Sequence, residues 1–232
     1  MPSEQRRALV TGSSSGIGRA IAERLLADGW QVTGVDIAPA AWMGPNLSAV
    51  SCDLADPAAV DALCASVAMP DAVVHAAGLM RAAPLGQLRH SDAQLMYAVH
   101  AGAAARLAEA WLPRMAAAGR GRMVLVGSRV ASGMPGRSLY AASKAALVAM
   151  ARSWAAEVVA RGVTVNVVSP AATRSGMTDD PGRGSSAVRT PPLGRLVEPA
   201  EIAALVAFLL GPEAAAITGQ DIAICGGASL NR

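Results

Sequence analysis

Apolar runs of strand length alternate with stretches of helical length along almost the whole chain. Buried strands that alternate with helices in this way form a parallel sheet covered by helices on both faces. We therefore expect an α/β fold, a single doubly wound Rossmann-type domain over residues 1–232 with about seven parallel strands. The strand-like runs are residues 8–10, 31–35, 72–75, 123–126, 163–168 and 222–224, and the helical stretches are residues 17–28, 57–66, 91–118, 138–161 and 199–210.

The composition fits a compact globular protein and argues against several other classes. Of the 232 residues, 53% are hydrophobic and 16% are charged, which argues against disorder. The net charge is +3 and the arginines are scattered, so nucleic-acid binding is a poor hypothesis. We see neither an apolar run of membrane-spanning length nor the core of a signal peptide, and we expect a cytoplasmic protein without membrane attachment.

The three cysteines, Cys52, Cys64 and Cys225, are far apart and lack the C-x-x-C spacing of metal and redox sites. A chain of this length buries enough surface to fold without disulfides or metals. We therefore interpret the cysteines as small core residues of a protein in a reducing compartment, and we expect no metal site.

A glycine-rich turn, Thr-Gly-Ser-Ser-Ser-Gly-Ile-Gly at residues 11–18, leads from the first strand into the first helix. Gly12 permits a tight turn, Gly16 lets the backbone approach a pyrophosphate, and Gly18 lets the helix pack against the sheet. The helix N-terminus adds free N–H groups and the positive end of its dipole. The turn therefore predicts a dinucleotide site. Its other expected contact residues are Ser14, Ser15 and Ile17.

Asp36 ends the second strand, roughly 20 residues past the glycines. A carboxylate in this place accepts hydrogen bonds from the hydroxyls of an adenosine ribose and repels a 2′-phosphate. Ile37 and Ala38 follow, so neither an arginine nor a lysine stands beside it. The sequence therefore favours NAD over NADP.

Ser128 follows a predicted strand, and Tyr140 and Lys144 share one face of the next predicted helix. Tyrosine has an ordinary pKa of about 10, and lowering it by about two units requires about 2.7 kcal/mol. An ammonium about 4 Å away in a partly shielded site supplies up to about 4 kcal/mol before desolvation. We therefore expect Tyr140 to exchange a proton with the carbinol, Lys144 to lower its pKa, and Ser128 to bind the substrate oxygen.

Together these motifs resemble the classical group of the short-chain dehydrogenase/reductase family over nearly the whole chain. Further segments carry the resemblance, among them Cys-Asp-Leu at residues 52–54, His-Ala-Ala-Gly at 75–78 and Asn-Val-Val-Ser-Pro at 166–170. It implies a nicotinamide-dependent enzyme with Ser128, Tyr140 and Lys144 as catalytic residues. The cofactor contacts that it adds are Asp53, Leu54, Ala76, Ala77, Gly78, Tyr140, Lys144, Pro170, Thr173 and Ser175.

Four positions depart from the family pattern. His100 stands where the family has an asparagine that holds a proton-relay water. An imidazole also binds water and shuttles protons, so we count His100 as catalytic, with an imidazole that merely fills space as an equally weighted alternative. Ala76 replaces an asparagine that tethers strands, and Ala171 replaces a glycine beneath the nicotinamide. Cys225 replaces an aspartate, with no consequence that we can derive.

The substrate side is expected to include Met80, Arg129, Met134 and the loop of residues 176–193. Arg129, Arg183 or Arg189 would meet an anionic substrate, although any one of them is more often an ordinary solvated arginine. Residues 173–193 are rich in Gly, Ser, Pro and Asp and lack periodicity, which predicts a lid over cofactor and substrate.

Our working hypothesis is an NAD(H)-dependent oxidoreductase that interconverts a secondary alcohol, a diol or hydroxy-acid derivative included, and a ketone. The alternative is a 3-oxoacyl-thioester reductase, but such enzymes mostly use NADPH and only Arg19 stands near the turn. A cis-dihydrodiol dehydrogenase fits NAD equally, and an NAD-binding protein with impaired catalysis is a further alternative. We expect a small-molecule substrate and a homodimer or homotetramer built on the small-residue helix faces.

Overall fold

The computed structural model describes residues 5–38, 42, 44–176 and 188–230. Its sheet has seven parallel strands in the order β3-β2-β1-β4-β5-β6-β7. The predicted α/β class and the number of strands are thereby confirmed. The strands are β1 (Arg7–Thr11), β2 (Gln31–Asp36), β3 (Leu47–Ser51), β4 (Ala72–His75), β5 (Gly121–Val126), β6 (Val163–Pro170) and β7 (Asp221–Ile224).

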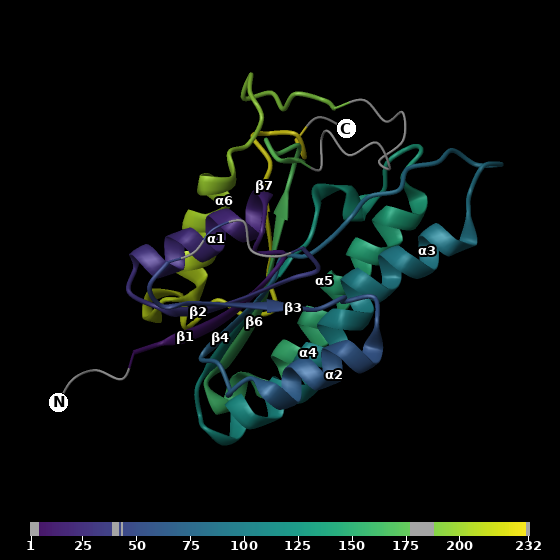
Figure 1. The fold of residues 1–232 in the computed structure, drawn as a ribbon. Helices are drawn as coiled ribbons and strands as arrows, with labels where there is room; N and C mark the ends of the chain where they lie inside the picture. The colour runs from purple at the N-terminus through teal and green to yellow at the C-terminus, as the bar shows by residue number, and fades with distance from the viewer. Residues whose placement is uncertain (1–4, 39–41, 43, 177–187, 231–232) are drawn as a thin grey trace.

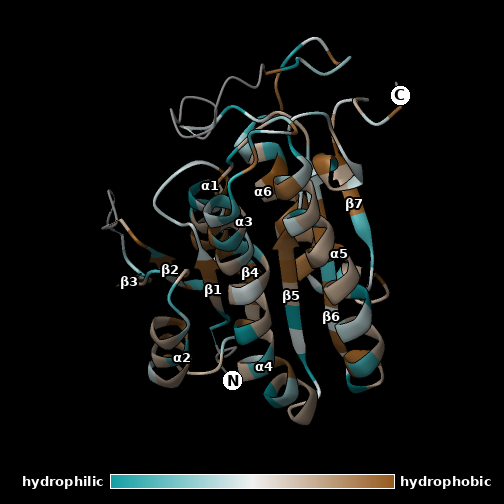
Figure 2. Ribbon diagram, turned by 90° about the vertical axis from the view of Figure 1, so that its right-hand side faces the viewer, coloured by the Kyte–Doolittle hydropathy of each residue, from teal (hydrophilic) through white to brown (hydrophobic). Residues whose placement is uncertain are grey.

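Helices cover both faces of the sheet (Figure 1). On one face lie α1 (Gly16–Ala27) and α6 (Pro199–Leu210), and on the other lie α2 (Pro57–Ser66), α4 (Ala103–Ala117) and α5 (Ser138–Val158). Successive residues of a strand point to opposite faces, so Leu9 of β1 packs in one apolar core and its neighbours Ala8 and Val10 pack in the other. Strands at the centre of the sheet are accordingly hydrophobic (Figure 2).

Two features of the fold differ from the sequence prediction. β3 was not predicted, because this edge strand is mostly exposed and reads Leu-Ser-Ala-Val-Ser, without a continuous apolar run. The helix predicted over residues 91–118 is divided into α3 (His90–Tyr97), a π-helical turn (Ala98–Gly102) and α4. Wide turns of this kind leave backbone carbonyls for other partners and often mark functional sites.

The strand order brings the predicted site residues to one edge of the sheet. The chain crosses from β1 towards β2 and β3 on one side and from β4 towards β7 on the other, so the order reverses between β1 and β4. Ligands of doubly wound sheets bind in the crevice at the carboxyl ends of the strands at this reversal. Thr11, His75 and Val126 end the three central strands there.

The predicted lid, residues 173–193, is only partly described. Residues 177–187, Arg183 among them, lie outside the described residues, and the lid remains a prediction. On its described side, Thr173 forms an isolated parallel bridge with Val197, just before α6.

Among the helices of the described ranges, none combines the length and the apolar character that crossing a bilayer requires.

Candidate active site

A cavity of about 1070 Å³ runs along the carboxyl edge of the sheet. It extends from the glycine turn after β1 and Asp36 at the end of β2 to Ser128 after β5 and to Tyr140 and Lys144 on α5. The structure thus brings the predicted catalytic and cofactor residues together, except that Ser14 and His100 do not line the cavity. The predicted cofactor residues that line it are Gly12, Ser15, Gly16, Ile17, Gly18, Asp36, Asp53, Leu54, Ala76, Ala77, Gly78, Tyr140, Lys144, Pro170, Thr173 and Ser175.

The glycine turn fits a pyrophosphate. Gly12 has a φ of +72°, and a Cβ there would come within 2.9 Å of the Cα of Ala77. A Cβ on Gly18 would collide with the carbonyl oxygen of Gly12, so only glycine lets α1 begin this close to the turn. The side chain of Ser15, the residue before α1, makes no capping hydrogen bond in the described structure. The first N–H groups of α1 are thus left to bind an anion.

Asp36 is built into the glycine turn. Its Oδ2 accepts the N–H of Ser14 at 3.0 Å, and its Oδ1 accepts the N–H of Ala38 at 3.2 Å. Ser14 therefore orients Asp36 rather than facing the cavity. Arg19, the nearest basic residue of the turn, pairs with Glu23 at 2.8 Å and lies over the Trp42 ring.

Ser128 and Tyr140 are buried at the other part of the cavity. The Ser128 Oγ accepts the N–H of Val130 at 3.2 Å, which fixes the start of the 3₁₀ turn Arg129–Ser132. A hydroxyl that accepts in this way keeps its own proton for donation. The Tyr140 ring lies edge-on to the His100 ring, with centroids 5.7 Å apart.

Lys144, the only lysine of the chain, is buried with its Nζ donating to the carbonyl oxygen of Val126 at 2.8 Å. Burial lowers its pKa to about 7, because the interior disfavours the charged form. The ammonium form is therefore disfavoured in the cofactor-free protein. The full ammonium charge expected from the sequence thus requires an additional negative charge nearby.

Two buried histidines form a hydrogen-bond chain behind the cavity. The Thr11 Oγ1 accepts the N–H groups of Ala76 and Ala77, both at 3.1 Å, so its proton goes to the Nδ1 of His75 at 2.9 Å. The Nε2–H of His75 then donates to the carbonyls of Val99 and His100 in the π-helical turn. Ala76 thus lacks the family's asparagine side chain, but Thr11 makes a tether between these strands.

The chain continues through the side chain of His100 to α5. The N–H of Leu79 donates to His100 Nε2 at 3.1 Å, so the ring proton lies on Nδ1 and is donated to Ser143 Oγ at 2.9 Å. Ser143 in turn donates to the carbonyl oxygen of Tyr140 at 2.8 Å. Burial and then the Lys144 charge lower the pKa of His100, and burial lowers that of His75 to about 4. Both imidazoles are therefore neutral.

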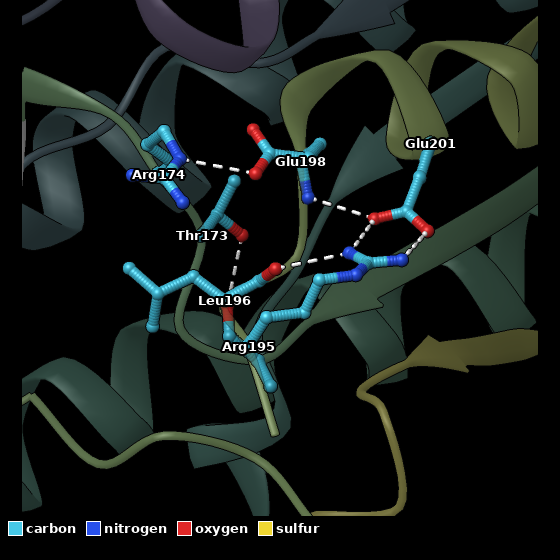
Figure 3. Close-up of polar contacts among 7 residues, drawn as sticks. Thr173, Arg174, Arg195, Leu196, Glu198 and Glu201 are labelled. Atoms are coloured by element: carbon cyan, nitrogen blue, oxygen red, sulfur yellow. Dashed lines mark hydrogen bonds and ion pairs between the residues drawn. The ribbon is translucent and has the colours of Figure 1, made fainter. Parts of the chain in front are cut away.

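The segment after β6 is held against the start of α6 (Figure 3). Thr173 donates to the carbonyl of Ala171 at 3.0 Å, and Ala171 donates its N–H to Ile224 at 3.2 Å. Arg174 pairs with Glu198, the residue that caps α6. The backbone that carries Ala171, Thr173 and Ser175 is thus anchored at the cavity wall.

Some residues of the site were missed by sequence reasoning. Arg81 and Arg137 line the cavity, and their approach depends on loops whose paths the sequence does not show. His75 was considered only as part of a motif. Its position at the end of a buried strand was the available signal, since a polar ring there needs buried partners.

The three cysteines are free thiols. Burial raises the pKa of Cys52, and it raises that of Cys64 to about 11.

Comparison with known proteins identifies the family. A family model described as enoyl-(acyl carrier protein) reductase matches residues 12–229. The 3-oxoacyl-[acyl-carrier-protein] reductase FabG of Vibrio cholerae is 35% identical, over 97% of both chains. A solved structure of a short chain dehydrogenase/reductase family protein superimposes with a TM-score of 0.90 at 34% identity, covering 99% of this chain and 100% of the other.

The chain belongs to the short-chain dehydrogenase/reductase family. It is therefore an oxidoreductase of a family that uses a nicotinamide cofactor, as the sequence resemblance implied. The D-threitol dehydrogenase of Mycolicibacterium smegmatis is 35% identical too, over 95% of this chain and 91% of that protein. Relatives of similar identity thus carry different substrate names.

The burial of Lys144 predicts an unusual titration and a gain of stability on its removal. Because Lys144 is the only lysine, ¹³C-labelled lysine gives one side-chain NMR signal, which we expect to titrate near pH 7. Its ordinary pKa is 10.5, so the unfolded chain binds more protons between pH 7 and 10.5, and stability rises with pH across that window. At pH 7 and below, Lys144→Met should raise the free energy of unfolding by about 1–3 kcal/mol. This net gain already allows for the lost hydrogen bond to Val126.

Denaturant unfolding at pH 7 and pH 10 measures the effect, and the gain should shrink at pH 10. A Lys144 signal that titrates near pH 10, or a variant less stable than the wild type at pH 7, would contradict this reading of the site.

Proposed function

We propose that this short-chain dehydrogenase/reductase uses NAD(H) to interconvert a secondary alcohol and a ketone, with Tyr140 as the acid and base. The observation that carries the proposal is the cavity that joins Asp36 and the glycine turn to Ser128, Tyr140 and Lys144. Such a cavity brings a dinucleotide bound at one part next to a proton-transfer group at the other.

The nucleotide part of the cavity supports NAD rather than NADP. The amides at the start of α1 would hold the pyrophosphate, and Asp36 would accept the ribose hydroxyls. A 2′-phosphate would meet the Asp36 carboxylate, which the N–H groups of Ser14 and Ala38 hold in place. Arg19, the nearest basic residue of the turn, pairs with Glu23 and lies over the Trp42 ring. Thr173 and Ser175 are placed by resemblance at the carboxamide.

The reacting part of the cavity supports alcohol and carbonyl chemistry. When bound, the nicotinamide supplies the hydride acceptor for oxidation and the hydride donor for reduction. Ser128 donates its proton in a hydrogen bond to the substrate oxygen. Tyr140 takes the carbinol proton during oxidation and returns it to the carbonyl oxygen during reduction. The negative charge that develops on Tyr140 would favour the ammonium form of Lys144, which would in turn stabilise the tyrosinate.

Two other functions remain as alternatives. The name of the Vibrio cholerae relative favours a 3-oxoacyl-thioester reductase, whereas that of the Mycolicibacterium relative favours a polyol, which is a substrate within the proposed secondary-alcohol class. An NAD-binding protein with impaired catalysis follows from the departures at His100 and Ala171, but Ser128, Tyr140 and Lys144 are intact and line the cavity. The cytoplasmic location and the homodimer or homotetramer stay predictions.

Replacing Tyr140 tests the function. With NADH and a panel of small ketones, Tyr140→Phe should lower kcat about 10²–10⁴-fold, because the general acid is lost. Tyr97→Phe is the matched control, since Tyr97 is the only other tyrosine and is exposed. NAD(H) should give a higher kcat/KM than NADP(H) in the wild type. Full activity of Tyr140→Phe would overturn the mechanism. A preference for NADPH would overturn the cofactor assignment, and binding of NAD without turnover would overturn the enzymatic function.

His100, which the sequence placed among the catalytic residues, has a different role in our proposal. It does not line the cavity, both ring nitrogens are hydrogen-bonded, and its pKa is well below the ordinary value. We propose that it is a positioning residue, which fixes Leu79 in the cavity wall and Ser143 beneath Tyr140.

The pH profile of a His100 variant separates positioning from proton relay. His100→Ala should lower kcat about 10-fold by the same factor from pH 6 to 9, since the lost contacts do not titrate in that range. His100→Asn, which keeps an acceptor for the Leu79 N–H, should recover part of the rate. His90→Ala, at the exposed start of α3, is the control. A pH-dependent loss that added imidazole restores would show a relay instead.

A further inference from the structure

We propose that the cavity selects substrates that carry an anionic group, a carboxylate or a phosphate, and that Arg129 and Arg189 bind this group. The inference rests on the proposed function, because it names the class of alcohol or ketone that the same site takes. Its basis is the distribution of charge along the cavity wall.

Among the residues that the structure describes, the acidic ones line only the nucleotide part of the cavity. They are Asp36 at the end of β2 and Asp53 after β3, and no other carboxylate of the described chain lines the wall. The remaining charged lining residues are basic: Arg81, Arg129, Arg137, Lys144 and Arg189. A bound anion would supply Arg129 and Arg189 with a negative partner in the cavity, whereas an uncharged substrate would not.

Arginines elsewhere in the described structure are commonly paired. Seven of them form ion pairs with carboxylates, and Figure 3 shows two, Arg174 with Glu198 and Arg195 with Glu201. No ion pair within the described ranges involves Arg129 or Arg189, although both line the cavity. A guanidinium that faces a cavity without a carboxylate partner is suited to bind an anion from solution, with two N–H groups for two oxygens.

The position of Arg129 places the anion near the reacting carbon. Arg129 directly follows Ser128, whose Oγ fixes this backbone by accepting the Val130 N–H. Around it, Met80, Val130 and Met134 belong to one apolar cluster with Tyr140. Low-polarity walls strengthen the attraction between a guanidinium and an anion. The site thus combines Ser128, which would bind the substrate carbonyl, with a short apolar wall and the cation of the next residue, Arg129.

Matched pairs of substrates test the proposal. One pair is 3-oxobutanoate and its methyl ester, and the other is dihydroxyacetone phosphate and the uncharged dihydroxyacetone. With NADH, we expect the anionic member of at least one pair to have a kcat/KM about 10-fold higher or more. The first pair identifies a carboxylate and the second a phosphate as the group that is recognised.

Arg129→Gln should lower kcat/KM for the anionic member about 10- to 100-fold, mostly through KM, and change the neutral member less than 2-fold. Arg189→Gln should act in the same direction, and Arg129→Lys should retain part of the effect. Arg106→Gln is the control, because Arg106 pairs with Asp61 away from this cavity. Equal rates for both members of each pair, or an equal loss on both in Arg129→Gln, would overturn the proposal.

Failure of the proposed function would appear differently, as no turnover of any member with NADH. Calorimetry of 3-oxobutanoate and of dihydroxyacetone phosphate with the NADH-saturated protein then decides the inference. Binding of either anion that Arg129→Gln weakens about 10-fold or more would support it, and binding of neither would overturn it.

Discussion

The hydrogen-bond chain from Thr11 to Tyr140 is the interaction on which the site depends. It joins the end of β1, the end of β4, the π-helical turn and α5, which are far apart in the sequence. Thr11 fixes the tautomer of His75, and the Leu79 N–H fixes that of His100, so the chain holds only while both rings are neutral. Because burial lowers the pKa of both rings, the nucleotide turn and the proton-transfer helix share one rigid frame at neutral pH.

The burial of Lys144 lowers the stability of the fold. Its amine is buried at the end of β5 and donates to the Val126 carbonyl, although the interior disfavours the ammonium form. A Cβ on Gly78 would lie 3.0 Å from His100 Nε2 and 3.4 Å from Lys144 Nζ, so a larger residue there would press on both side chains. A buried amine of this kind lowers stability, and we interpret it as stability sacrificed for a cation that stabilises the Tyr140 anion during catalysis.

Much of the fold could be predicted because its signals are local. α2 and α6 have the predicted bounds, since Asp56-Pro57 and Glu198-Pro199 mark their starts in the sequence. β3 and the π-helical turn could not be predicted. β3 is an exposed edge strand, and the turn depends on His75, which lies 24 and 25 residues before the carbonyls that it binds.

In the site, too, local motifs were predictive, whereas contacts between distant segments were not. Motifs predicted which residues line the cavity, with Ser14 and His100 as the exceptions. They could not predict that Thr11 accepts the N–H of Ala76 and so links the strands there, or that Arg81 and Arg137 line the cavity. These contacts form only when distant segments of the chain pack together. His100 is the clearest case. From its place in the sequence, this imidazole was interpreted as a proton shuttle. The structure shows that Leu79 and Ser143 occupy both of its ring nitrogens.

The central claim is direct hydride transfer between a nicotinamide and a carbonyl carbon beside Tyr140. The most direct measurement is a reaction with NADH deuterated at the transferred position of C4, using the ketone that the wild type reduces fastest, followed by mass spectrometry of the alcohol. Our account predicts one deuterium on the carbinol carbon in ordinary water, and none when unlabelled NADH reacts in deuterated water and the product hydroxyl is exchanged back. Deuterium that stays in the cofactor, or that appears on the carbinol carbon from the solvent, would contradict it.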